Sequence, residues 1–228
     1  MSLDSMVSWW TGNERLIALL FDALQQTLAM VFAAGLIGFL FGIPLGVLLH
    51  ISKKSGLLEN VSFNKVLGTI INIGRSIPFI ILLVAIIPFT RLIVGSSIGT
   101  AAAIVPLTIA AIPFIARLVE GALLEVPSGL VEAAQAMGAK PMQIIMKVLL
   151  PEALPGIINA ITITLVTLVG YSAMAGTVGG GGLGDVGIRY GYQRFDGTVM
   201  MITVVILVIL VQIIQSLGDY LVKRVDHR

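Results

Sequence analysis

The side chains that most often carry enzymatic chemistry are scarce in this 228-residue sequence. It contains no cysteine and only two histidines, His50 and His227, which lie far apart in the chain. The lack of cysteine excludes a disulfide framework, a thiolate zinc site and a thiol nucleophile, and two distant histidines disfavour a histidine-based metal or catalytic cluster. The chain also lacks the G-x-x-x-x-G-K-[ST] pattern that cradles nucleotide phosphates, and it contains no Gly-Lys dipeptide. We therefore predict no active site and no bound cofactor, and any ATP chemistry would belong to another chain.

A second group of side chains has a different use. Tyr171, Ser172, Met174 and Thr177 interrupt a stretch rich in glycine and alanine within a long apolar segment. Such side chains would be candidates to line a solute pathway if this segment crosses a membrane. Met174 is flexible and apolar and could form a hydrophobic gate, with simple filling of core space as the alternative.

The composition explains which elements must position these residues. Hydrophobic residues make up 57% of the chain and charged residues only 11%, whereas soluble domains carry about 25% charged residues. A membrane-spanning helix needs about 20 mainly apolar residues. Five segments satisfy this requirement: residues 23–52, 66–90, 92–116, 156–178 and 197–218. The sequence therefore predicts an all-α membrane protein with five transmembrane helices.

Two of these spans have notable residues. In the second, Arg75 is the only charge, and it marks either a site or a helix end that reaches the headgroups; Pro78 just after it should kink the helix. In the first, glycines 38, 42 and 46 repeat every four residues and share one helix face. Such a face allows close helix packing in lipid, which we expect here, with a moving hinge as the alternative.

The distribution of basic residues predicts the orientation. Nine Lys and Arg fall on one side of the predicted spans and four on the other, with Arg75 unassigned. Because cytoplasmic loops are enriched in Lys and Arg, the N-terminus is expected outside and the C-terminus inside. Residues 1–20 would be an extracytoplasmic tail and interfacial lead-in, with Trp9 and Trp10 at the membrane boundary. Residues 21–221 would form a single transmembrane domain, and residues 222–228 would form a cytoplasmic tail. The net charge of +2 is too small, and the basic residues are too scattered, to indicate a nucleic-acid surface.

The loop over residues 117–152, cytoplasmic on this count, does not resemble a simple connection. Pro127 and Ser128 can start a helix, with Ser128 as the N-cap residue, over residues 129–137. Gly138 suits the left-handed position after a helix, and Pro141 can open a second helix that runs to Leu150. Two short helices separated by a tight turn predict a protrusion that docks to another protein. The glycine-rich stretch at 179–184 is instead expected to be a conformable extracytoplasmic loop, whose solvated face would carry Asp185, Arg189, Arg194 and Asp196.

Seven positions of the cytoplasmic loop match the E-A-A-x3-G-x9-I-x-L-P signature of ABC-importer permeases. They are Glu132, Ala133, Ala134, Gly138, Val148, Leu150 and Pro151, with Val148 in place of isoleucine. Residues 74–84, 88–95, 103–107, 113–117 and 169–174 resemble the methionine-importer permeases, so that the similarity extends through the five-span core.

This resemblance implies a type I importer permease in a bacterial inner membrane. It implies a homodimer, two cytoplasmic ATP-binding subunits, an extracytoplasmic substrate-binding lipoprotein and methionine as the substrate. The helix carrying Glu132 would sit in a groove of the ATPase, and the seven signature residues would couple ATP hydrolysis to transport. The dimer is also expected independently, because five mostly apolar helices leave little room for a polar conduit within one subunit.

Three alternatives remain open. The chain could belong to an ABC importer of another amino acid or a small osmolyte. It could also be a secondary transporter or channel that works without an ATPase, although only Arg75 is then available as an ionisable relay. A purely structural membrane scaffold would leave the signature loop without a purpose.

Overall fold

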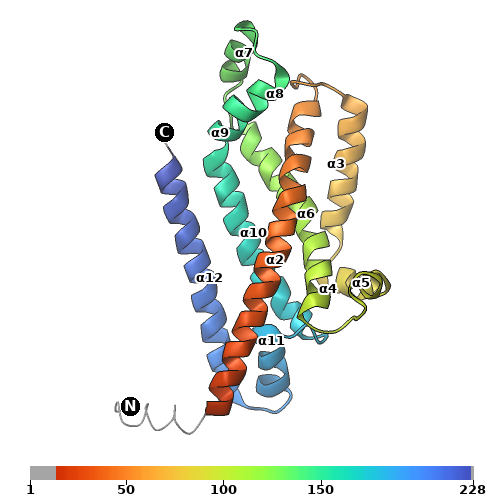
Figure 1. Ribbon diagram of the computed structural model, residues 1–228, viewed down its shortest axis with the longest axis vertical. Coiled ribbons are helices and arrows are strands. Elements are labelled where there is room, and N and C mark those ends of the chain that lie inside the picture. The colour runs from red at the N-terminus through yellow and green to blue at the C-terminus, as the bar shows by residue number, and fades with distance from the viewer. Residues whose placement is uncertain (1–13, 227–228) are drawn as a thin grey trace.

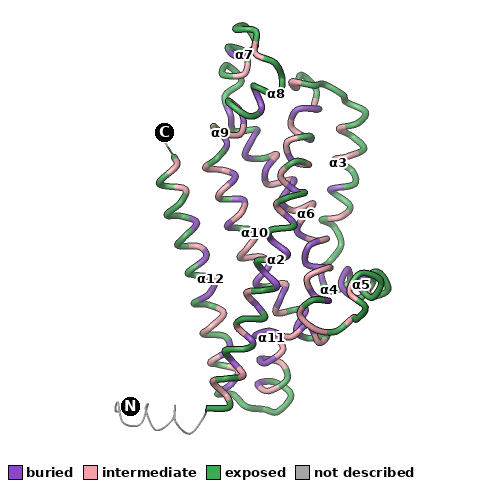
Figure 2. The backbone as a smooth tube through the Cα atoms, in the orientation of Figure 1, coloured by how far each residue is buried: buried purple, intermediate pink, exposed green. Residues whose placement is uncertain are grey.

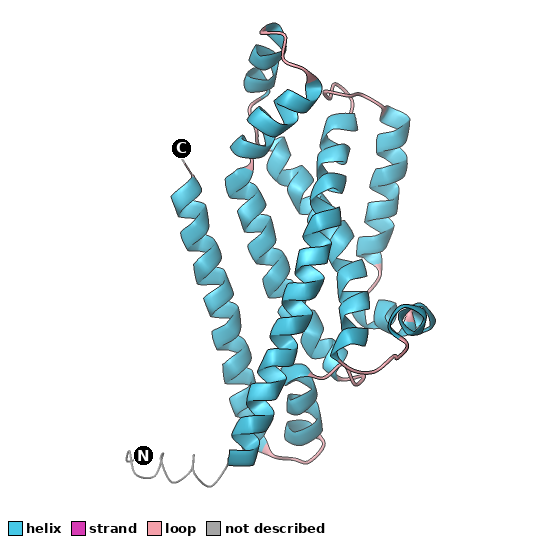
Figure 3. Ribbon diagram, viewed as in Figure 1, coloured by secondary structure: helices cyan, strands magenta, loops and turns pink. Residues whose placement is uncertain are grey.

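The computed structural model describes residues 14–226, which form helices joined by short turns, with no strand in that range (Figures 1 and 3). Trp9 and Trp10 lie outside the described residues. The elements are α2 (Glu14–Ser52), α3 (Val61–Ser76), α4 (Phe79–Ala85), α5 (Ile87–Val94), α6 (Thr100–Leu124), α7 (Ser128–Ala136), α8 (Pro141–Ile144), η1 (Ile145–Leu149), α9 (Leu150–Glu152), α10 (Leu154–Gly176), α11 (Gly182–Val186), η2 (Gly187–Tyr192) and α12 (Gly197–Val225).

The long helices run roughly along one axis of the molecule (Figure 1). Helices α7 and α8 lie at one end of this bundle together with the C-terminal end of α12, and we call it the α7 end. Helix α11 lies at the opposite end, beside the first turns of α2, and we call it the α11 end. Successive long helices connect the two ends in alternating directions, so the described chain begins at the α11 end and finishes at the α7 end.

The core of the bundle is the contact between α2 and α6, where buried residues from both helices meet (Figure 2). Glycines on α2 make this contact possible. A Cβ atom added to Gly42 would lie 2.7 Å from Ile115 Cβ, and one added to Gly46 would lie 2.6 Å from the carbonyl oxygen of Ala116. The predicted close packing of the 38, 42 and 46 face is therefore confirmed.

The second predicted span is not one continuous helix. Helix α3 ends at Ser76, Ile77 is extended, and α4 departs at 96° after Pro78. Proline disfavours the helical conformation in the residue before it, which explains why the chain breaks at Ile77. The kink at Pro78 is confirmed, and the single helix over residues 66–90 is wrong. Four described helices are long and apolar enough to cross a membrane, or five if α3 and α4 count as one broken span.

The third span is displaced from its predicted position. Residues 92–94 belong to the short helix α5, which Gly95 ends in the left-handed conformation with φ of 79°. The long helix α6 starts only after Gly99 and continues to Leu124. The predicted loop at 117–152 consequently loses its first eight residues, 117–124, to α6, which continues through Gly121 and ends at Leu124, shortly before Pro127.

The glycine-rich stretch is not a conformable loop. The backbone N–H groups of Gly182 and Leu183 donate to Gln26 Oε1 at 2.8 Å and to Thr27 Oγ1 at 2.9 Å, which fixes the start of α11 against α2. A Cβ atom at Gly184 would collide with the backbone of Ala173. The four charged residues predicted as its solvated face have specific contacts: Arg189 pairs with Asp185, Arg194 lies over the Tyr190 ring, and Asp196 accepts from the first N–H groups of α12.

Candidate functional site

The predicted docking protrusion is helix α7 and the turn after it. The predicted helix over residues 129–137 is confirmed with small shifts, since α7 begins at Ser128 and ends at Ala136. Ser128 is not the N-cap residue; Pro127 takes that position, without a side-chain hydrogen bond. Gly138 has φ of 80°, and the N–H of Ala139 donates to the Ala134 carbonyl at 3.1 Å. The left-handed turn predicted at Gly138 is therefore confirmed.

The two alanines of the signature point in different directions. Ala134 is only 5% exposed and belongs to the same core cluster as Ile144 and Leu149. Glu132 and Ala133 are exposed. One side of α7 thus anchors the helix to its own chain, and the other side presents Glu132 and Ala133 outward.

The second half of the signature forms the return path into the bundle. Helix α8 begins at Pro141, as predicted, and the Lys140 N–H donates to Gln143 Oε1 at 2.8 Å. The helical path continues through the π-helical turn η1 into α9, so it passes the predicted end at Leu150. Val148 and Leu150 are half-buried against the core cluster, whereas Pro151 is exposed. These residues connect α7 to the long helix α10.

A cleft of about 470 Å³ separates α7 from the turn between α2 and α3. Its walls include Glu132 and Gln135 from α7, Glu125 from the end of α6, and His50 and Lys53 from the end of α2. This cleft could not be predicted from local sequence, because its two walls are about 80 residues apart in the chain. Lys53, Glu125 and Glu132 surround this one opening, beside the exposed side of α7.

The four predicted pathway residues do not share one environment. Met174 is 46% exposed and Thr177 is exposed, although the Thr177 hydroxyl donates to the Met174 carbonyl at 2.7 Å. Ser172 is 1% exposed and its hydroxyl donates to the Val169 carbonyl. The Tyr171 ring stacks on Phe79 of α4 with 4.5 Å between the centroids. Of these four residues, Met174 and Thr177 are exposed, Tyr171 is half-buried and Ser172 is buried.

The exposed side of α10 extends further than the sequence suggested. Asn159, Ile163, Gly170 and Met174 are all exposed and recur at intervals of four, seven and four residues, which places them along one helix face. Asn159 and Gly170 were not predicted as pathway residues. Their exposure on the same face as Met174 is visible only once the packing of α10 is known.

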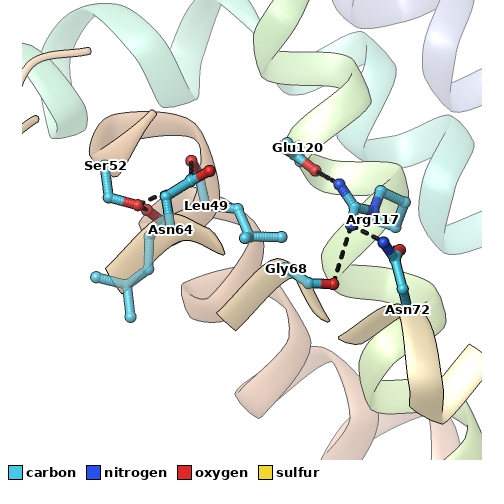
Figure 4. Close-up of polar contacts among 8 residues, drawn as sticks. Leu49, Ser52, Asn64, Gly68, Asn72, Arg117 and Glu120 are labelled. Atoms are coloured by element: carbon cyan, nitrogen blue, oxygen red, sulfur yellow. Dashed lines mark hydrogen bonds and ion pairs between the residues drawn. The ribbon is translucent and has the colours of Figure 1, made fainter. Parts of the chain in front are cut away.

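A polar network ties α3 to the core helices (Figure 4). The Arg117 guanidinium on α6 donates to Glu120 Oε2 at 2.6 Å, to Asn72 Oδ1 at 2.7 Å and to the Gly68 carbonyl at 3.4 Å. Nearer the start of α3, Asn64 Nδ2 donates to the Leu49 carbonyl at 2.7 Å and to Ser52 Oγ at 3.0 Å. Arg117 was predicted only as a loop charge, and its position within α6 makes it a structural cross-link instead.

No cluster of three or more metal-ligating side chains occurs in residues 14–226. The arrangement instead combines a membrane-spanning helical bundle with a protruding helix at one end and an exposed helix face leading away from it. Such a bundle can conduct a solute and be moved by a partner, and these are the properties of a transporter permease.

The comparison with protein families agrees with that class. Residues 42–228 match the model of the family described as binding-protein-dependent transport system inner membrane component. The chain belongs to this family, and it is accordingly a multi-pass inner-membrane component of an ABC importer. The prediction of a permease without its own ATPase site is consistent with this assignment.

Individual relatives are more specific. A protein of Vibrio cholerae named "Probable D-methionine transport system permease protein MetI" is 68% identical over 228 residues, which cover 100% of both chains. The Escherichia coli K12 protein named "D-methionine transport system permease protein MetI" is 60% identical over 164 residues, covering 72% of this chain and 76% of that one. The resemblance to methionine-importer permeases is therefore confirmed.

Solved structures give the same result for the fold. The chain superimposes on an inward-facing structure of the MetNI methionine ABC transporter with a TM-score of 0.93 and 58% identity, covering 94% of this chain and 100% of that one. An amino acid ABC transporter crystallised with histidines matches with a TM-score of 0.76 at 19% identity, covering 98% of this chain and 99% of that one. The second match shows the shared fold alone.

Proposed function

We propose that this chain is the transmembrane subunit of an ATP-driven importer of methionine, working as a homodimer with two ATP-binding subunits and a substrate-binding lipoprotein. The observation that carries the substrate is the 68% identity to the Vibrio cholerae protein over the whole chain. The observation that supports the coupling role is the outward presentation of Glu132 and Ala133 on a helix anchored by the buried Ala134.

The ATPase would dock at the α7 end, on the exposed side of α7. The small side chain of Ala133 permits close approach, and Met137, 82% exposed, offers apolar surface beside it. Movement of the ATPases would shift α7, and the adjoining helices α6 and α10 would carry this shift as nearly rigid bodies. Gly138, Val148, Leu150 and Pro151 would hold the geometry of this connection.

The α7 end would then face the cytoplasm. The described part of that end is rich in basic residues, which lie at the ends of α2 and α12 and in the segment between α7 and α9: Lys53, Lys54, Lys140, Lys147, Lys223 and Arg224. This distribution follows the excess of Lys and Arg in cytoplasmic loops. The N-terminus would lie outside and the C-terminus inside.

The pathway would run between two copies of the chain. The exposed face of α10 carries the flexible Met174, and the polar Asn159 lies on the same face nearer the α7 end, in a cleft that Glu152 and Asp226 also line. Facing a second copy across a two-fold axis would bring two such faces together around water. Met174 from each copy would then act as the hydrophobic gate, with Tyr171, Ser172 and Thr177 positioning it.

The test is uptake of labelled D- and L-methionine by cells that lack their own methionine importer and express this chain with its ATPase and binding protein. We expect uptake by the wild type and little or none by Glu132→Lys, which reverses the exposed charge on α7. Lys65→Glu is a matched charge reversal on α3 at the same end and should retain uptake. Wild-type uptake in the Glu132→Lys variant would contradict the coupling role, and a correctly inserted wild-type complex that takes up another amino acid instead would exclude methionine.

A further inference from the structure

Arg75 is a charged side chain at the middle depth of the bundle. It lies ten residues beyond Lys65 on α3, a distance of about 15 Å along a helix, or half of a hydrocarbon core of about 30 Å. Its guanidinium carbon lies 5.9 Å from the ring centroid of Phe114, which is itself near the middle of α6. Both helices therefore place Arg75 far from either membrane surface.

The surroundings of Arg75 differ sharply from those of Arg117. Arg117 contacts the same pair of helices, α3 and α6, and it donates to a carboxylate, an amide oxygen and a backbone carbonyl. Arg75 is exposed and has neither a hydrogen bond nor an ion pair within residues 14–226, and its aromatic neighbour is at the outer limit of a cation–π contact. Gly74 packs against Pro113, which holds this turn of α3 in place.

An unpaired guanidinium at this depth is unfavourable against lipid, because the charge loses its hydration there. The helix break at Ile77 and Pro78, two residues further on, leaves both residues exposed. Non-helical backbone at membrane depth is tolerated where it lines a water-filled cavity or is buried in protein. The charge and the break are separate observations, and both indicate that this side of α3 faces water.

We propose that Arg75 binds the carboxylate of the transported amino acid inside the pathway, an inference that rests on the importer function proposed above. A guanidinium presents two parallel N–H donors that match the two oxygens of a carboxylate. Phe79, four residues beyond Arg75, stacks on Tyr171, so the break lies alongside α10. The exposed Met174 is on the next turn of α10 and provides an apolar surface for the substrate side chain.

Access from water can be measured directly because the chain contains no cysteine. Arg75→Cys and Ile73→Cys are each placed in the complete transporter and treated with a charged, membrane-impermeant thiol reagent. Ile73 is exposed on the opposite side of α3, two residues away. We expect labelling of Cys at position 75 and no labelling at position 73. Failure to label position 75, or equal labelling of both positions, would overturn the proposal.

The role of the charge is tested by transport in the same complex. Arg75→Gln should lower methionine uptake by about tenfold or more, the effect of one lost charge-assisted contact, and Arg75→Lys should retain an intermediate rate. Uptake is compared only among variants that co-purify with the ATPase. This criterion excludes misfolded variants from the comparison. Wild-type uptake by Arg75→Gln would refute this inference alone, whereas loss of uptake in the wild-type complex would refute the importer function itself.

Discussion

The Arg117 network provides a stability prediction whose size follows from the structure. Replacing Arg117 by Met removes the ion pair with Glu120 and the hydrogen bond to Asn72 while keeping a long apolar side chain. Breaking a buried ion pair costs about 3–5 kcal/mol, and an exposed pair contributes at most about 1 kcal/mol. The Arg117 and Glu120 side chains are 30% and 13% exposed, so we expect an intermediate loss of about 2–3 kcal/mol.

This loss corresponds to a melting temperature lower by about 5–10 °C for a chain of this size. The assay is the fraction of a fluorescent fusion that remains monodisperse in size-exclusion chromatography after heating. The control is Arg91→Met, because Arg91 is exposed and its Nε donates only to Ser97 Oγ at 3.1 Å. That control should change the melting temperature little.

The double variant Arg117→Met with Glu120→Leu distinguishes the effect of breaking the ion pair from the effect of losing the arginine side chain. It removes both charges, so no carboxylate is left without its partner, and it should recover more than half of the lost stability. If Arg117→Met melts like Arg91→Met, the contacts of Arg117 do not stabilise the bundle as described. If the double variant is less stable than Arg117→Met, the unpaired Glu120 carboxylate is not what destabilises the single variant.

The two remaining predictions concern close backbone approaches. Gly46→Val should sharply reduce the yield of monodisperse protein, because its Cβ would lie 2.6 Å from the Ala116 carbonyl oxygen. The control Gly121→Ala should leave the yield unchanged, because a Cβ at Gly121 has no neighbouring atom within 4 Å. Equal yields of the two variants would contradict the α2–α6 packing. Gln26→Leu should speed amide exchange at Gly182 by removing its acceptor at 2.8 Å, as followed by hydrogen–deuterium exchange, whereas Gln25→Leu on the exposed side of α2 should not.

Features set by local sequence were the ones predicted well. The first, fourth and fifth apolar spans, the packing glycines of α2, the helix over residues 129–137 and the left-handed Gly138 all depend on residues within a few turns of each other. A charged or polar side chain ends an apolar run, and a glycine in the left-handed conformation ends a helix, as Gly138 does after α7, without reference to the rest of the chain. The seven signature positions also lie within one segment, so their grouping needed no tertiary information.

Features that depend on distant residues were missed. Pro78 indicated a kink, but the 96° angle depends on where α4 packs, against α6 and against Tyr171 of α10. The glycines at 179–184 suggested a loose loop because their acceptors, Gln26 and Thr27, are 156 residues away. Arg117 looked like a loop charge because its partner Asn72 is 45 residues away on α3.

The way α7 is attached explains how a small contact at one end can reach the middle of the membrane. Helix α6 packs along α2 and ends at Leu124, and only the short turn at Glu125, Val126 and Pro127 separates it from α7. On its other side, α7 passes through Gly138 into the continuous helical path α8, η1 and α9, which leads into α10. Val126 and Ala134 are both buried in the core cluster, so α7 is attached to the bundle through more than its two ends.

A force on α7 therefore acts on α6 and α10 together. Of these two, α10 has an exposed face that includes Met174, whereas α6 is held by α2 along the glycine contact. Helix α10 is itself closely packed, with Gly156 against Ala122 of α6 and Thr162 against Gly218 of α12, so α6 and α10 should carry the movement to the proposed gate as one unit.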